Sequence, residues 1–430
     1  MLGPGEDLGR DRPSRTGATA PRRVPAHRNV PSADGSAGVT QEVRLSDNAT
    51  PSLPEAKSWL RAHLAQRRNP FNAIGEAAAS RYIETLPGVD PVRWAEHWLG
   101  GAAEFASAAE RADIDGDRDT ALENWWQAYQ FAFLGRYPSP THPAKLAAYE
   151  LARTYFARVC EREKTPVEQV SVPFDGRAGE GRSVSFLVAR PPGPDAARPP
   201  VVLMWGGIDV WKEESYARGR LLRERGFATV HIDKPGVGQS PVLAGPDAER
   251  QWNPVFEWLR NRDDLDSERV AALGLSFGGY WAMKLAHTHR EHLTAAVNWG
   301  GGVHLTFQPE WQEKSRNASS YLMDLMPARA RIFGGTTFAD YVARCPELSL
   351  LDQGILDQES CPLLLVNGKD DQQNASADIH LALEHGAPKS ARLFPGGHMG
   401  SGPVLPTIVD WLTDRLAPPA RPTGSRRELT

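Results

Sequence analysis

Apolar side chains between residues 51 and 165 recur at the spacing of an α-helix. Three stripes with this period are Trp94, Trp98, Ala102 and Phe105; Leu122, Trp126, Tyr129 and Phe133; and Tyr149, Ala152, Phe156 and Val159. Proline and glycine interrupt the pattern at 69–70, 88–91, 115–117 and 138–140. The segment is therefore predicted to form amphipathic helices that pack through their aromatic residues, with Trp126 and Tyr129 as candidates to line a ligand cavity.

From residue 166 the pattern changes to short apolar runs separated by helical stretches. The first two runs, 167–174 and 184–188, predict a hairpin. The later runs are 201–205, 228–232, 270–274, 295–299, 363–366 and 391–394. Helical stretches between and after them are 211–225, 246–260, 278–288, 374–385 and 404–416. This alternation predicts an α/β fold with a mostly parallel, doubly wound sheet, whose functional site lies at the carboxyl ends of the strands.

Composition changes this picture mainly at the two ends of the chain. Residues 1–50 contain no Phe, Trp, Tyr or Lys, and they are rich in Gly, Pro, Ser and Arg. Such a segment buries too little apolar surface to offset its ordering entropy, so 1–50 is predicted to be a disordered tail. Residues 417–430 have a similar composition and receive the same prediction.

Charge and cysteine content exclude several classes of function. A net charge of −4 provides no global field for a polyanion, and no run of about 18 apolar residues exists, so we expect neither a nucleic-acid nor a membrane partner. Cys160, Cys345 and Cys361 are too few and too far apart for a disulfide framework or a thiolate metal site. We expect a cytoplasmic protein with a small-molecule substrate, no cofactor and no metal; a homodimer is left open.

A candidate nucleophile follows the run at 270–274. The sequence Gly274-Leu275-Ser276-Phe277-Gly278 fits G-x-S-x-G between a predicted strand and a predicted helix. In that context the serine stands on a tight turn that raises its hydroxyl above the sheet, and the flanking glycines avoid side-chain clashes. Ser276 is therefore predicted to be a catalytic nucleophile.

A serine hydroxyl needs a base and an acid that orients the base. His398 lies on a glycine-rich loop after the last predicted strand, and it is the histidine that fits the chain order Ser, Asp, His. The acid is expected after the preceding strand, where Asp370 and Asp371 compete; the usual loop length selects Asp371, with Asp370 as the alternative.

An oxyanion formed by attack on a carbonyl needs preorganised N–H donors. One predicted donor is the backbone N–H of Phe277, directly after the nucleophile. The other is expected in the loop Gly206-Gly207-Ile208-Asp209 after the strand at 201–205, where glycine lets the backbone approach a substrate. Gly207 is the first choice, and Ile208 is the alternative and a candidate substrate contact.

Together these residues resemble the α/β-hydrolase superfamily over residues 166–416. A narrower resemblance lies in the string from Gly206 to Glu214, Gly-Gly-Ile-Asp-Val-Trp-Lys-Glu-Glu. Preceded by a helical segment, it is similar to the family of the fermentation–respiration switch protein, the FrsA-like esterases. That family is in turn similar to bacterial 2,6-dihydroxypseudooxynicotine hydrolases and fungal polyketide-shortening hydrolases, and it includes esterases and enzymes that hydrolyse carbon–carbon bonds next to a carbonyl.

The resemblance implies a domain organisation and further site residues. Residues 51–165 would form a helical cap over a catalytic domain at 166–416, with a lid insertion at 303–358. Asp209, Lys212 and Glu213 would position the loop and its helix, although acids there also suit a helix N-terminus. Some carbon–carbon hydrolases of the family carry an extra acid after the sixth strand. Here that segment offers His304, a candidate substrate contact, and then Glu310 and Glu313, with no clear match.

The resulting hypothesis is a serine hydrolase that cleaves an ester, a thioester or an acyl carbon–carbon bond through an acyl-enzyme. Aromatic residues of the cap and lid indicate an apolar or aromatic substrate of modest size. One alternative keeps the same three residues in an acyltransferase or cyclase, because acceptor choice depends on cavity shape and water access. Another alternative is a regulatory binding protein with a vestigial hydrolase site.

Overall fold

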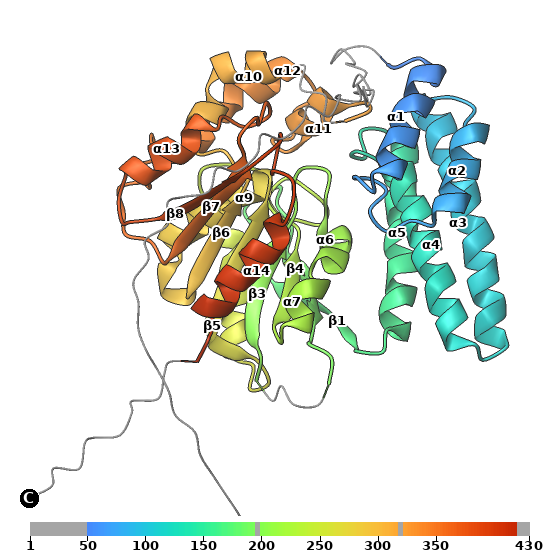
Figure 1. Cartoon of the computed structure of the whole chain (residues 1–430), viewed down its shortest axis with the longest axis horizontal. Coiled ribbons are helices and arrows are strands. Elements are labelled where there is room, and N and C mark those ends of the chain that lie inside the picture. Colours follow the sequence, from blue (N-terminus) through green and yellow to red (C-terminus); the bar gives the residue numbers. More distant parts are fainter. Residues whose placement is uncertain (1–49, 194–197, 317–320, 419–430) are drawn as a thin grey trace, which may run out of the picture. The chain divides into compact units, whose positions relative to one another are not determined.

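The computed structural model describes residues 50–193, 198–316 and 321–418. Residues 1–49 and 419–430, which hold nearly all of the two predicted tails, lie outside the described residues. Figure 1 labels the helices and strands of the described chain.

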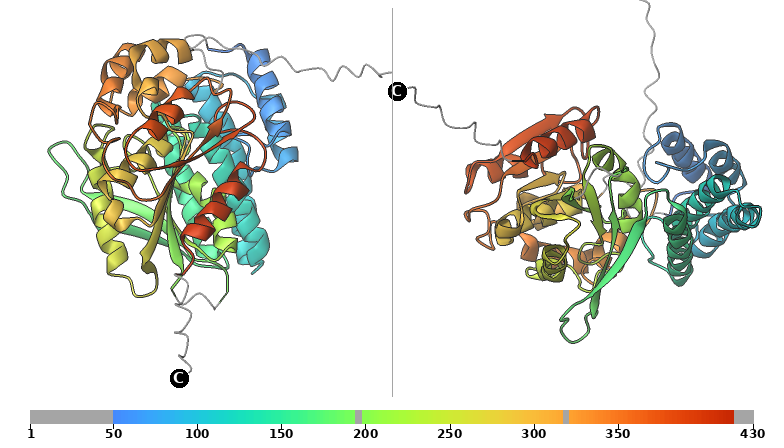
Figure 2. Two further views of the ribbon diagram at one scale, coloured as in Figure 1. Left: turned by 60° about the vertical axis from the view of Figure 1, so that its left-hand side comes forward. Right: turned by 90° about the horizontal axis from the view of Figure 1, so that it is seen from below.

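An eight-stranded sheet has the order β1-β2-β4-β3-β5-β6-β7-β8. β1 and β2 pair as an antiparallel hairpin at one edge, as Figure 2 also shows, and β2 pairs antiparallel to β4. The remaining pairs, from β4 to β8, are parallel. The strands are β1 Val167–Pro173, β2 Ser183–Ala189, β3 Pro200–Trp205, β4 Ala228–Ile232, β5 Asp266–Leu275, β6 Ala295–Trp299, β7 Leu363–Gly368 and β8 Ser390–Phe394. Every strand predicted from the apolar runs is present, so the runs were correctly interpreted.

Alternate side chains of the strands enter two different cores, as the twofold period of a strand requires. On β3, Val201 and Leu203 belong to one core, and Val202 and Met204 belong to the other. The first core includes residues of α8 (Asn253–Arg260), α9 (Phe277–Thr288) and α13 (Ala377–Glu384). The second core includes residues of α7 (Arg220–Glu224) and α14 (Val404–Arg415). Helices therefore cover both faces of the sheet.

The helix predicted at 211–225 is in fact two helices, α6 (Lys212–Arg218) and α7, which meet at Gly219. Gly219 packs closely against His231 of β4, and a Cβ there would come within 2.8 Å of the His231 ring. The stretch predicted at 246–260 likewise begins as a 3-10 helix, Ala248–Trp252, before α8. Neither break was predicted from the sequence.

The segment predicted to be helical forms five helices with breaks at the predicted prolines and glycines. Asp90 and Asp117 accept hydrogen bonds from the first turns of α3 and α4, and Pro91 opens α3. The Trp94 indole N–H of α3 donates to the Leu134 carbonyl of α4 at 2.7 Å, and Figure 1 shows these long helices side by side. The helices are α1 Leu53–Ala65, α2 Glu76–Thr85, α3 Pro91–Ile114, α4 Arg118–Arg136 and α5 Pro143–Arg162.

Between β6 and β7 the chain forms short helices in the region predicted as a lid. These are the 3-10 helices Leu305–Phe307 and Cys345–Leu348, with α10 Pro309–Ser315, α11 Leu325–Arg331 and α12 Phe338–Arg344 between them. Cys345, like Cys160 and Cys361, is buried and unpaired. No helix of the described chain is both long enough and apolar enough to cross a membrane.

Candidate active site

The turn between β5 and α9 places Ser276 in a backbone conformation that residues other than glycine rarely adopt. Its φ is 54° and its ψ is −128°, and such strain persists only where surrounding structure imposes it. Here the Ser276 N–H donates to the Trp299 carbonyl of β6 at 2.7 Å. A Cβ at Gly274 would clash with the Gly278 carbonyl, so the glycine is required for the turn to close. The predicted strand–turn–helix around Ser276 is present.

A chain of hydrogen bonds joins Ser276 to the loops after β7 and β8. His398 Nε2 lies 2.7 Å from Ser276 Oγ, and His398 Nδ1 lies 2.8 Å from Asp371 Oδ2. The Met399 N–H donates to Asn367 Oδ1 at 2.9 Å, which fixes the backbone beside His398. The structure thus brings together the three residues that the sequence selected from three separate strand ends.

The two competing aspartates have different surroundings. The Asp371 carboxylate is buried and accepts hydrogen bonds from the Asn367 side chain and from the backbone N–H groups of Gln373 and Asn374. Burial alone would raise the pKa of Asp371, but the charge and hydrogen bond of His398, with the other donors, bring the pKa below its usual value. Asp370 is exposed at the rim of the cavity. The geometry therefore associates His398 with Asp371.

Ser276 opens into a cavity of about 760 Å³. Most of its lining residues carry polar side chains, and its exposed surface is divided about equally between polar and apolar atoms. The lining residues include His63, Gln66, Arg68 and Asn69 after α1, Asp209 and Arg218 around α6, and Tyr321, Asp370, Gln372 and Gln373. Most of these residues were not predicted from the sequence, because they come from loops that only the folded chain brings together.

None of the four residues that the sequence offered as substrate contacts, Ile208, Trp126, Tyr129 and His304, is among the described residues that line this cavity. Tyr129 is buried and donates from its hydroxyl to Glu214 Oε1 at 2.7 Å. Trp126 stacks near the Tyr216 ring of α6, with centroids 6.2 Å apart. His304 bonds to Ser349 Oγ through Nδ1 at 2.6 Å. Helical periodicity placed Trp126 and Tyr129 on an apolar stripe, and Tyr129 is buried while Trp126 is partly buried; the pattern could not tell which neighbours cover them.

The loop after β3, residues 206–209, lies directly beside Ser276, and because it was predicted to supply an oxyanion donor we refer to it below as the oxyanion loop. A Cβ at Gly207 would approach Ser276 Oγ to 3.3 Å, so the backbone of Gly207 borders the reacting hydroxyl. Phe277, the other predicted donor, is the first residue of α9, where a helix does not use its own N–H. Ile208 is partly buried, and its carbonyl accepts from the Trp211 indole at 3.1 Å.

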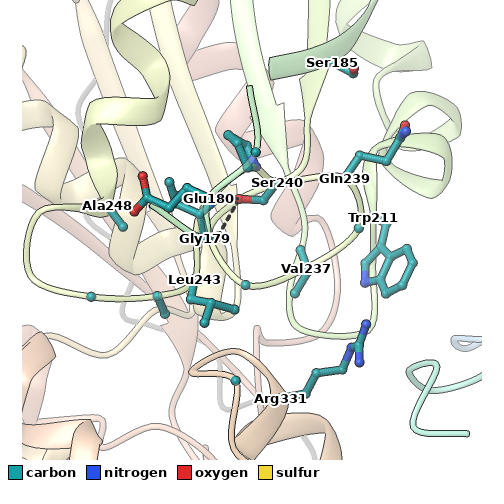
Figure 3. A pocket seen from close by; sticks show the side chains of 18 of the residues that line it. Gly179, Glu180, Ser185, Trp211, Val237, Gln239, Ser240, Leu243, Ala248 and Arg331 are labelled. Atoms are coloured by element: carbon teal, nitrogen blue, oxygen red, sulfur yellow. Dashed lines mark hydrogen bonds between the residues drawn. The ribbon is translucent and has the colours of Figure 1, made fainter. Parts of the chain in front are cut away.

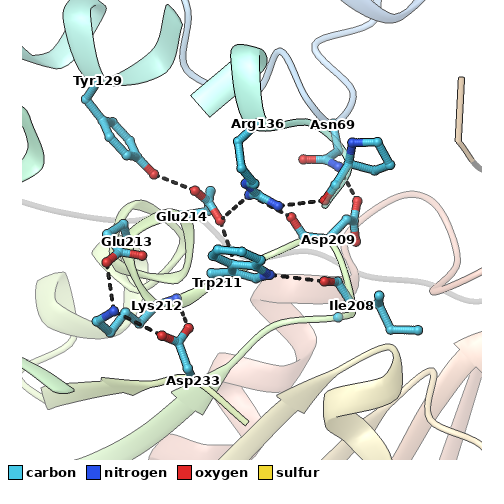
Figure 4. Close-up of polar contacts among 12 residues, drawn as sticks. Asn69, Tyr129, Arg136, Ile208, Asp209, Trp211, Lys212, Glu213, Glu214 and Asp233 are labelled. Atoms are coloured by element: carbon cyan, nitrogen blue, oxygen red, sulfur yellow. Dashed lines mark hydrogen bonds and ion pairs between the residues drawn. The ribbon is translucent and has the colours of Figure 1, made fainter. Parts of the chain in front are cut away.

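Residues of the helical segment hold this loop, as Figure 4 shows. Arg136 of α4 donates to the Asp209 carbonyl at 3.1 Å and to Glu214 Oε2 at 3.2 Å. Asn69 Nδ2 donates to Asp209 Oδ2 at 2.6 Å. Neither Asn69 nor Arg136 was predicted, although a charged residue that ends an aromatic-rich helix just before a proline was a visible signal.

The string from Lys212 to Glu214 also contributes buried contacts at the start of α6. Lys212 Nζ lies 2.8 Å from Glu213 Oε1 and 3.0 Å from Asp233 Oδ2 (Figure 4). Glu214 Oε2 accepts from the Trp211 N–H at 2.6 Å. These contacts tie the helix that follows the oxyanion loop to the end of β4.

A second hollow, of about 1040 Å³, lies between α5, the β1–β2 turn and residues 236–250 (Figure 3). Its lining does not include Ser276, His398 or Asp371, and several of its arginines have acidic partners, as Arg250 has in Glu180. Among the described residues, no cluster of three or more His, Cys, Asp and Glu side chains is placed to hold a metal ion. The candidate chemistry therefore lies in the cavity at Ser276.

Comparisons with known proteins identify a matching family model and related sequences. The family model described as "Esterase FrsA-like" matches residues 76–417. The 2,6-dihydropseudooxynicotine hydrolase of Paenarthrobacter nicotinovorans is 26% identical, over 76% of this chain and 85% of its own. Esterase FrsA of Photobacterium profundum is 24% identical, over 78% of this chain and 79% of its own.

Two solved structures have a similar fold. The crystal structure of the 2,6-dihydroxy-pseudo-oxynicotine hydrolase aligns with a TM-score of 0.67 at 22% identity, covering 80% of this chain and 93% of that one. Wild-type AbyA5 aligns with a TM-score of 0.61 at 23% identity, covering 85% and 99%. The predicted α/β-hydrolase fold is confirmed.

Proposed function

Because the chain belongs to the FrsA-like esterase family and is an α/β-hydrolase enzyme, we propose that Ser276, His398 and Asp371 form its catalytic triad. The observation that carries the proposal is the unbroken hydrogen-bond chain from Ser276 Oγ through His398 to Asp371. His398 Nε2 would take the Ser276 proton as Oγ attacks a carbonyl carbon. Asp371 would hold the imidazole in the tautomer that this step needs and stabilise the imidazolium.

Attack would move negative charge onto the carbonyl oxygen, which needs donors already in place. The N–H groups of Phe277 and of Gly207, or Ile208 in its place, border Ser276 and are proposed to bind that oxygen. His398 then returns the proton to the leaving group, which departs and leaves an acyl-enzyme. Water, activated by the same histidine, would release the acid and restore Ser276.

An ester or thioester is the first substrate class, and the cavity suits a substrate with both polar and apolar groups, because polar side chains and apolar surface both line it. An acyl carbon–carbon bond is the second class, since the resemblance in sequence includes enzymes that hydrolyse such bonds. The acids after β6 do not favour it: Glu310 and Glu313 are exposed on α10 and do not line the cavity.

Intact-mass spectrometry after treatment with a fluorophosphonate tests the nucleophile. We expect one adduct that maps to Ser276, is absent from Ser276→Ala, and persists in Ser401→Ala, which removes another serine of the same cavity. A panel of esters, thioesters and diketones, with and without an added alcohol, would then separate hydrolysis from acyl transfer. A folded wild-type protein that forms no adduct would contradict the proposal and favour a binding protein with a vestigial site.

A further inference from the structure

Lys234 places a buried ammonium group behind the oxyanion loop. The residue lies two positions after the end of β4, and its side chain is fully buried. Lys234 Nζ donates to the Gly207 carbonyl at 2.5 Å, and it lies 5.6 Å from the centroid of the Phe277 ring. The ammonium thus contacts one predicted oxyanion donor residue and lies close to the other.

No carboxylate within residues 50–193, 198–316 and 321–418 lies at ion-pair distance from Lys234. The neighbouring Asp233 carboxylate is used by the backbone N–H groups of Lys212 and Gln239 and by Lys212 Nζ. Burying an ammonium with a neutral carbonyl as its partner is unfavourable. Burial accordingly lowers the pKa of Lys234 to about 7, although the charges of Asp233 and Asp209 oppose this shift and that of Arg136 adds to it.

The position of the Lys234 ammonium indicates what its unfavourable burial achieves at the site. The C=O and N–H of one peptide unit are held in one plane and point in opposite directions. A cation on the Gly207 carbonyl therefore fixes the peptide between Gly207 and Ile208 and polarises the N–H of Ile208, the alternative oxyanion donor. The Val210 N–H also donates to this carbonyl, but at 3.4 Å, so Lys234 makes the shorter contact. A positive charge in a dry site stabilises nearby developing negative charge far more than it would in water.

We propose that Lys234 is a positioning residue of the active site, which holds the oxyanion loop through the Gly207 carbonyl and supplies positive charge behind the forming oxyanion. The inference rests on the proposed serine-hydrolase function. It predicts that replacing Lys234 lowers activity but not stability. The reason is that the Lys234 charge stabilises the transition state while its burial destabilises the native protein.

Lys234→Met tests this inference in the full-length protein. We expect kcat at pH 6.5 to fall about 10- to 100-fold with little change in KM, since the lost interaction acts on the transition state. Because the Lys234 ammonium loses its proton as the pH rises above about 7, the difference in kcat between wild type and variant should shrink toward pH 9. A uniform loss at every pH would indicate a packing defect and contradict the inference.

Thermal unfolding gives the second readout. A lysine whose pKa is lower in the folded state destabilises the protein most below that pKa, and the penalty fades as the pH rises toward 10.5. Lys234→Met should therefore have a Tm equal to or above that of the wild type at pH 6. Lys212→Met is the matched control: it removes the partner of two buried carboxylates, so its Tm should fall.

Fluorophosphonate labelling separates the possible failures. If the wild type is not labelled at Ser276, the proposed function itself fails. If wild type and Lys234→Met are labelled at the same rate and have equal kcat at pH 6.5, the triad stands and the role of Lys234 is refuted.

Discussion

The two sides of Ser276 are built in different ways. On one side, His398 and Asp371 come from the loops after β8 and β7, and neighbouring loop residues such as Asn367 fix them. On the other side, Asn69 and Arg136 from the helical segment hold the oxyanion loop, and Lys234 holds it from the end of β4. The base side is thus assembled from loops at the carboxyl ends of the strands, whereas the oxyanion side also depends on side chains of the helical segment.

This difference indicates which role the helical segment has at the active site. A cap that only covered a substrate would affect access and selectivity. Here Arg136 contacts the backbone carbonyl of Asp209, and Asn69 contacts its side chain. Asp209 is one of the residues that line the cavity. We therefore expect changes in the helical segment to alter the chemical step as well as substrate binding.

The largest effect is expected on the base side. Asp371→Asn keeps the shape of the side chain but removes the charge that orients His398, so kcat should fall by about 10⁴-fold. Asp370→Asn, the adjacent control, should lose far less, because Asp370 is exposed and His398 bonds to Asp371. Steady-state kinetics of both variants with one activated ester would decide the matter, and equal losses would overturn the assignment.

The same contrast explains how much could be predicted from the sequence. Strands, the nucleophile turn and the order Ser276, Asp371, His398 follow from local patterns at strand ends, and the fold was predicted correctly from them. The oxyanion side depends on pairings such as Asn69 with Asp209, and no motif at a strand end marks Asn69. No local pattern encodes such a pairing, because a single polar residue in a turn has many possible partners until the chain has packed.

An intermediate effect is expected from Arg136→Met on the oxyanion side. The Arg136 guanidinium is buried against Glu214 and lies over the Trp211 ring. Its loss should lower the free energy of unfolding by about 3 kcal/mol, since Glu214 would lose its cation. Releasing the Asp209 carbonyl should also lower kcat about 10-fold, measured at a temperature where the variant is folded.

Arg162→Met is the matched control for this variant. Arg162 pairs with Asp113 inside the helical segment, away from the oxyanion loop. Arg162→Met should lower the free energy of unfolding without lowering kcat. If both arginine variants lowered kcat equally, the helical segment would act through its stability alone, and the proposed difference between the two sides would disappear.

The smallest effect is expected one contact further from the loop, at Tyr129. Tyr129→Phe removes the hydrogen bond to Glu214, while Arg136 and the Trp211 N–H continue to hold that carboxylate. A hydrogen bond to a charged group contributes about 1.5 kcal/mol, so the free energy of unfolding should fall by roughly that amount in a urea titration. Activity should stay within about 2-fold of wild type, because the buried hydroxyl does not line the cavity. A 10-fold rise in KM at unchanged stability would instead show that Tyr129 contacts the substrate, as its place in the aromatic stripe had suggested.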